Sequence, residues 1–221
     1  MFRTIASAAV AFTLAGTAYA GEFRDLNNRF SLTAPDGWTS EAPPAPAVAL
    51  VVASPRKPET GGNCNVVLAD NPLKGQTQAE IDQQLASVIN AEFWKTMIGQ
   101  AKMFKSINID DWGTREQRGR NVHYVKATSE IDAGGTTLSV TQLMNLYVMP
   151  GQSAAITCTA RTEAYDREEG DISSIMNSFE PRPDMTVAAY RFPRAPVNVG
   201  TIAPFVAIES AKAGGWRVTR R

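Results

Sequence analysis

One histidine and a few grouped carboxylates are the side chains of this sequence that best suit catalysis or metal binding. His123 is the only histidine in the chain. It shares a strand face with Val125 and Ala127, which favours a half-buried, hydrogen-bonded structural residue over a ligand. Zinc needs three or four nitrogen, sulfur or oxygen ligands, and one histidine with two cysteines does not supply a usual set. The sequence therefore predicts no zinc site.

Asp110, Asp111 and Asp132 are the carboxylates that a calcium or manganese site could use. Their spacing matches no calcium-binding loop, and adjacent surface carboxylates are usually just solvated. The chain also lacks the G-x-S-x-G, phosphate-binding glycine loop and H-E-x-x-H motifs. We therefore expect no metal, no cofactor and no catalysis, although two of the 22 acidic residues could still meet as the paired carboxylates of a hydrolase.

The chain has two cysteines, Cys64 and Cys158. Each lies in an alternating apolar stretch, on the face of a predicted strand that points inward. A buried disulfide across the sheet is the favoured interpretation, and it requires Cα atoms within about 7 Å of each other. Two separate buried thiols are the alternative. A catalytic thiol is not expected, because neither cysteine has a plausible histidine partner.

The N-terminus has the features of a secretory signal peptide. Arg3 is followed by an apolar run from residue 5 to residue 15 and then by Ala18-Tyr19-Ala20, the small-x-small pattern that signal peptidase recognises. The run is shorter than the roughly 20 apolar residues that span a bilayer. Cleavage near Ala20 would leave a soluble, periplasmic or secreted chain with no transmembrane anchor. A retained N-terminal helix is the alternative.

Charge is distributed unevenly along the chain. Residues 21–180 carry a net charge of −6, whereas residues 181–221 carry +5. The near-neutral total argues against nucleic acid as a partner, because phosphate binding needs a basic surface. The basic tail either folds back on the acidic body or contacts an anionic partner or membrane surface. Its candidate interaction residues are Trp216, Arg217, Arg220 and Arg221.

The hydrophobic pattern predicts an α+β domain over residues 21–181, with an antiparallel sheet flanked by helices. A capping box at Thr77 begins a helix that reaches about residue 100, with a possible break near Phe93. The closing helix covers 165–179. The tail, 182–221, contains several prolines and is expected to be partly extended and helical near 204–212. Strands are predicted at 30–35, 48–53, 63–69, 103–113, 119–131, 136–149 and 153–160.

The layout resembles the PsbP-like family over about residues 23–181. The resemblance rests on Phe30-Ser-Leu-Thr-Ala-Pro-Asp-Gly-Trp38, on the helix and long strands that follow, and on a closing helix that ends Ser178-Phe179-Glu180-Pro181. It implies an α/β/α sandwich that serves as an accessory or binding module, as in extrinsic photosynthetic subunits and bacterial envelope proteins. No functional residue carries over, the basic tail lies outside the usual pattern, and nothing in the chain supports a photosystem role.

Two functional hypotheses follow. The first is an exported, non-catalytic binding or accessory module that acts through a protein or envelope surface. It predicts an exposed apolar or basic patch that includes Trp216. The alternative is a small-ligand carrier or hydrolase with a pocket between sheet and helix, which predicts converging polar groups in a cleft, for example near His123.

Overall fold

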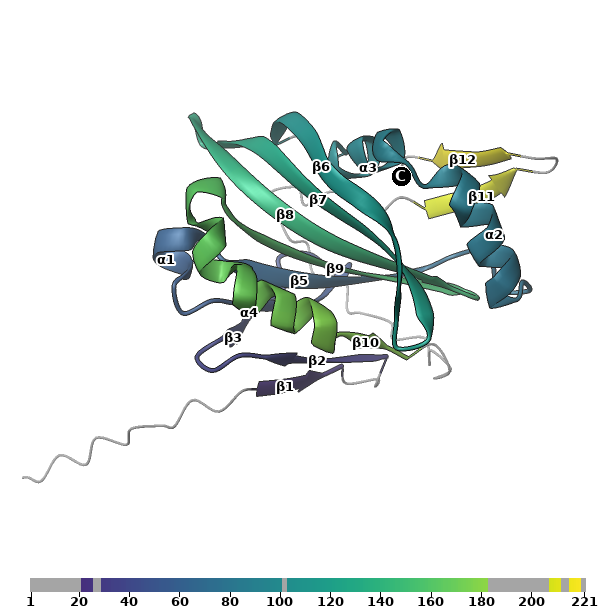
Figure 1. The fold of residues 1–221 in the computed structure, drawn as a ribbon, viewed down its shortest axis with the longest axis horizontal. Helices are drawn as coiled ribbons and strands as arrows, with labels where there is room; N and C mark the ends of the chain where they lie inside the picture. The colour runs from purple at the N-terminus through teal and green to yellow at the C-terminus, as the bar shows by residue number, and fades with distance from the viewer. Residues whose placement is uncertain (1–20, 26–28, 101–102, 183–206, 212–214, 220–221) are drawn as a thin grey trace, which may run out of the picture.

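A computed structural model describes residues 21–25, 29–100, 103–182, 207–211 and 215–219, the last two ranges as backbone. Its main element is a seven-stranded antiparallel sheet. The strands lie in the order β3 (Thr39–Glu41), β4 (Val48–Ala53), β5 (Asn63–Asp70), β9 (Gln152–Arg161), β8 (Thr136–Met149), β7 (Arg120–Ala133) and β6 (Phe104–Gln117). Strands β6, β7 and β8 form the long twisted part of the sheet (Figure 1).

Helices and a second small sheet cover the two faces of this main sheet. Helix α4 (Tyr165–Ser178), preceded by the short 3-10 helix η1 (Thr162–Ala164), packs on one face together with a sheet of β1 (Gly21–Arg24), β2 (Phe30–Ala34) and β10 (Glu180–Pro181). Helices α2 (Gln78–Val88) and α3 (Ala91–Ile98) pack on the other face. The remaining elements are the single-turn helix α1 (Lys57–Thr60) and a hairpin of β11 (Ala207–Ala211) and β12 (Gly215–Thr219).

The alternation of side chains along each strand produces two hydrophobic cores. Beneath α4, Ile172 and Ile175 meet Phe30 and Leu32 of β2 and Ile156 of β9. Beneath α2 and α3, the second core contains Ile81, Leu85, Trp94, Val125 and Leu146. A helix–sheet–helix arrangement of this kind is the predicted α/β/α sandwich.

The first long helix is interrupted earlier than the sequence suggests. Its start is as predicted, because the Thr77 hydroxyl accepts from the Glu80 amide while the Glu80 carboxylate accepts from the Thr77 amide at 2.8 Å. Ile89 is extended, however, and Asn90 caps a separate helix by accepting from the Phe93 amide at 3.0 Å. The asparagine is a strong N-cap residue, so the chain starts a new helix there.

The tail differs from its predicted secondary structure in one place. Residues 207–211 form strand β11, which pairs with β12, and not the helix expected near 204–212. Two consecutive glycines, Gly214 and Gly215, follow β11 in the sequence, and a Gly-Gly pair favours a turn over a helix. The expected boundary between the domain and the tail at residue 182 stays a prediction.

Within the described residues, none of the helices combines the length and the apolar character needed to span a membrane.

Candidate functional site

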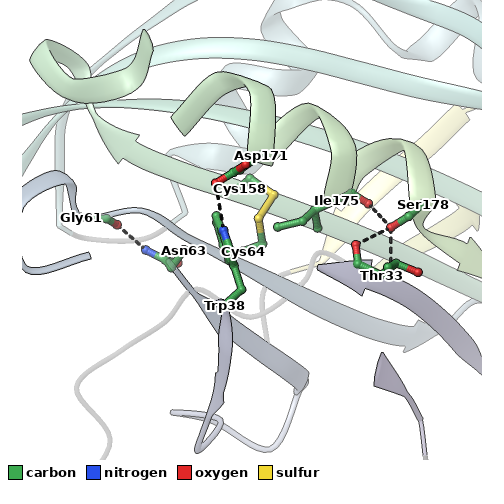
Figure 2. Close-up of a disulfide and its surroundings, with 9 residues drawn as sticks. All are labelled: Thr33, Trp38, Gly61, Asn63, Cys64, Cys158, Asp171, Ile175 and Ser178. Atoms are coloured by element: carbon green, nitrogen blue, oxygen red, sulfur yellow. Dashed lines mark hydrogen bonds between the residues drawn. A yellow bond between two sulfur atoms is a disulfide. The ribbon is translucent and has the colours of Figure 1, made fainter. Parts of the chain in front are cut away.

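A disulfide joins β5 and β9, which are neighbours near the centre of the main sheet although they are far apart in the sequence. Cys64 of β5 and Cys158 of β9 are directly opposed, with a Cα–Cα distance of 4.0 Å and a sequence separation of 94. Both cysteines are buried in the core beneath α4, and Figure 2 shows the bridge beside the indole of Trp38. The predicted disulfide is therefore present, and neither cysteine is a free thiol.

A buried carboxylate lies near the N-terminus of α4. Glu168 is 0% exposed. One of its oxygens accepts from the Ser54 and Thr60 hydroxyls at 2.9 and 2.7 Å, and the guanidinium of Arg56 donates to both oxygens. Arg56 also pairs with Asp171 at 2.7 Å, and these two carboxylates raise its pKa. Every oxygen of Glu168 has a partner, so the cluster clamps α4 to the β4–β5 connection.

His123 is a hydrogen-bonded strand residue, as the sequence predicted, and it is more deeply buried than the half-buried position expected. Its side chain is 3% exposed, and its Nδ1 lies 2.8 Å from the Thr114 hydroxyl. Burial lowers the pKa of the imidazole, and the charge of Asp82 opposes this shift only in part. The ring is therefore neutral at pH 7, and its hydrogen bond joins β7 to β6. It does not line the pocket described below.

The three aspartates considered as metal ligands lie among protein partners. Asp110 accepts from Asn108 and Thr128, and Asp132 accepts from the Gly135 amide, which lowers the pKa of that carboxyl together with Lys105. Asp111 is opposite Lys126 in the β6–β7 ladder. Across the described ranges, no three histidine, cysteine or acidic side chains come together as a group able to hold a metal ion.

Of the four candidate interaction residues in the tail, two belong to the described residues and two do not. Trp216 and Arg217 lie on β12, where Trp216 pairs with Ser210 and Arg217 with Glu209 along the backbone. Arg220 and Arg221 lie outside the described residues. The apolar or basic patch expected at these four positions stays a prediction.

A pocket of about 290 Å³ opens at the β3 edge of the main sheet. Val48 and Val51 of β4 form its apolar floor, and Asn63 and Asn65 of β5 supply amide groups. The remaining lining residues come from the end of β3, from the connection that follows it and from α1: Glu41, Ala42, Pro44 and Lys57.

The pocket lies on the sheet face that points away from α4. Val51 and Asn65 are register partners, and each alternates with residues of the core beneath α4, Val52 and Cys64. The Lys57 ammonium pairs with the Glu41 carboxylate at 2.7 Å across the rim. The pocket is therefore between the sheet and the β3–β4 connection, and not between sheet and helix as the alternative hypothesis expected.

Two large hydrophobic side chains are exposed at the opposite edge of the sheet, one on β6 and one next to it. Within the described residues, Met103 and Trp112 are the large hydrophobic residues left exposed, and Trp112 is 42% exposed. Trp112 lies opposite Val125, whose side chain belongs to the core beneath α2 and α3. Strand β6 ends the sheet, so one side of its backbone faces no other strand of that sheet.

Sequence reasoning missed both the pocket and the β6 surface. Asn63 and Asn65 flank Cys64, and that alternation placed them on the outer face of the strand. Nothing in the sequence shows that the β3–β4 connection returns over this face. The exposure of Trp112 depends on β6 being an edge strand, which follows from strand order and not from local pattern.

Comparisons with known proteins agree with this architecture. A scan against models of protein families finds no match, and a search of curated proteins finds none. Among solved structures, cyanobacterial PsbP (CyanoP) from Synechocystis has a TM-score of 0.53 and 13% identity, with 78% of this chain and 98% of that chain covered.

Two further solved structures are more distant. LpqN, involved in cell envelope biogenesis of Mycobacterium tuberculosis, has a TM-score of 0.44 and 12% identity, covering 70% of this chain and 83% of that chain. A protein from Bacteroides thetaiotaomicron has a TM-score of 0.44 and 10% identity, covering 75% of this chain and 50% of that chain. The likeness to CyanoP shows that the fold is PsbP-like, as the sequence predicted.

Proposed function

We propose that this chain is an exported, non-catalytic accessory module of the cell envelope that acts by binding another envelope component through its surface. The observation that carries the proposal is the buried cross-strand disulfide Cys64–Cys158. Disulfides of this structural kind form and persist in oxidising compartments and are rare in the cytosol. The signal-peptide pattern over residues 1–20 supports the same location.

The PsbP-like fold and the β6 edge support the binding role. Trp112 is an exposed aromatic residue on an edge strand, and tryptophan is among the side chains that most often anchor protein interfaces. Two of the buried titratable groups, His123 and Glu168, form hydrogen bonds within the protein, which favours a structural role for them. Binding through a surface is therefore the function that these features support best.

Site-specific photocrosslinking in the native host tests this proposal. A photoreactive amino acid would replace Trp112, and the matched control would carry it at Ser174, an exposed residue of α4. We expect a discrete crosslinked envelope component from position 112 and none from position 174. Equal labelling at both positions, or no product at 112, would contradict the proposed surface.

Cell fractionation tests the location. The mature chain is expected outside the cytoplasm, shortened by about 20 residues if cleavage follows the leader rule, and with its two cysteines oxidised. A reduced, full-length chain in the cytoplasm would rule the proposal out.

A further inference from the structure

The pocket at the β3 edge continues into a row of polar side chains on the same face of the sheet. Asn63 is the register partner of Thr159, and Thr159 is the partner of Gln142 on β8. Asn65 is likewise the partner of Thr157. The five side chains therefore form two short tracks of amide and hydroxyl groups that lead from the pocket across β5, β9 and β8.

Most of these polar groups have no partner within the described protein. Asn63 donates to the Gly61 carbonyl at 2.8 Å, as Figure 2 shows. The side chains of Asn65, Gln142, Thr157 and Thr159 form no hydrogen bond with other described residues. Gln142 is 7% exposed, and its amide atoms are not among the fully buried polar atoms that lack a partner in the described residues. The polar groups of these four side chains are therefore available to bond solvent or a ligand.

The electrostatics of the pocket select against a charged ligand. Glu41 and Lys57 are the charged residues of its lining, and they are paired with each other. An ion would therefore meet no unpaired opposite charge there. The amides can both donate and accept, as the hydroxyls of Thr157 and Thr159 can.

The volume of the pocket and the valines in its lining further limit the class of ligand that it could bind. Val48 and Val51, which are 5% and 8% exposed, leave only a small hydrophobic surface beside the amide groups. The volume of about 290 Å³ lies just below the range of roughly 300–1,000 Å³ that is usual for ligand sites. A ring with one apolar C–H face and several hydroxyl groups satisfies both features. We propose that the pocket and its polar tracks bind an uncharged carbohydrate, with one sugar ring over Val48 and Val51 and neighbouring hydroxyls bonded to Asn65, Thr157 and Gln142.

This binding site is independent of the surface proposed above. The pocket lies at the β3 edge and Trp112 lies on β6 at the other edge of the seven-stranded sheet. A variant at one edge should leave the other function intact, so failure of one proposal is distinguishable from failure of the other.

Nuclear magnetic resonance titration of the mature full-length protein tests the carbohydrate proposal. The probes are three neutral disaccharides (maltose, cellobiose and N,N′-diacetylchitobiose) and, as a competing ligand class, a neutral blocked tripeptide of alanine. We expect at least one disaccharide to give saturable shifts at Val51, Asn65 and Thr157, and the tripeptide to give none. No saturable shift with any disaccharide, shifts confined to other residues, or binding of the tripeptide at the pocket would overturn the proposal.

Two variants make the assignment specific. Asn65→Leu removes the amide at the pocket wall and should weaken disaccharide binding at least tenfold. Asn177→Leu is the matched control, because Asn177 is an exposed asparagine of α4 on the other side of the sheet, and its affinity should equal that of the wild type. Melting curves of both variants establish that they fold. If folded Asn65→Leu binds as tightly as the control, the proposal is wrong.

Discussion

At the scale of single residues, Glu168 is the most constrained charged group in the described protein. Its carboxylate is fully buried and accepts from two hydroxyls and one guanidinium. Removal of a carboxylate from such a cluster leaves several donors without an acceptor, and this is the situation in which a single substitution is most costly.

Glu168→Ala is therefore expected to lower the free energy of unfolding by about 2–4 kcal/mol. Because the Arg56 side chain is partly exposed to solvent, the loss of stability should be smaller than that caused by breaking a fully buried ion pair. Glu169→Ala is the control, since Glu169 is an exposed neighbour whose contact with Lys126 spans 3.5 Å, and it should change stability by less than about 0.5 kcal/mol. Urea denaturation of the two variants measures the difference, and equal losses would contradict the role assigned to the Glu168 cluster.

At the scale of elements, Gly62 beside α4 and Gly170 within α4 show that local packing decides whether a change of glycine to alanine raises or lowers stability. A Cβ at Gly62 would lie 2.8 Å from the carboxylate carbon of Glu168 and 3.0 Å from Cβ of Ser54. At Gly170, in the exposed middle of α4, nothing lies within 4 Å of the added atom. The first glycine allows the connection before β5 to approach the helix, whereas the second has no such function.

The two substitutions should consequently have opposite signs. Gly62→Ala is expected to destabilise the protein by about 1–3 kcal/mol through overpacking. Gly170→Ala should stabilise it by roughly 0.5–1 kcal/mol, because alanine favours the helical backbone more than glycine does. Thermal unfolding of each variant beside the wild type gives the signs directly. Stabilisation by Gly62→Ala would show that the close approach is not a constraint.

The elements also show where sequence reasoning works and where it stops. The strand at 136–149 and the disulfide were predictable, because alternation and cysteine placement are local signals. Strands β1 and β10 were not, since they are short and exist only by pairing with β2. The pocket depends on the path of the β3–β4 connection, and the exposure of Trp112 depends on strand order. Neither property is encoded within one stretch of sequence.

At the scale of the whole molecule, the disulfide joins the early and late parts of the chain. Strand β5 belongs to the first third of the sequence, and β9 follows the long β6–β7–β8 meander, yet the two are neighbours at the centre of the sheet. The bridge closes a loop across 94 positions. In the chain-entropy account, closing so long a loop removes much of the conformational entropy of the unfolded chain and so stabilises the folded state.

Removing the bridge by Cys64→Ala with Cys158→Ala is expected to lower the free energy of unfolding by about 4–5 kcal/mol. Reduction of the wild type should shift its denaturation midpoint in the same direction, whereas the double variant should not respond to reductant. Urea unfolding with and without dithiothreitol measures both effects. A reductant response in the double variant, or none in the wild type, would contradict this account.

The pairing of β5 with β9 also sets an order of events as the chain is made. Synthesis proceeds from the N-terminus, so Cys64 emerges well before Cys158. Strand β5 can pair with β4 at once, but its second neighbour, β9, is made only after β6, β7 and β8. Distant pairings of this kind slow folding. The sulfur–sulfur bond can therefore form only after β9 has been made, and its presence shows that Cys64 and Cys158 have come together across β5 and β9.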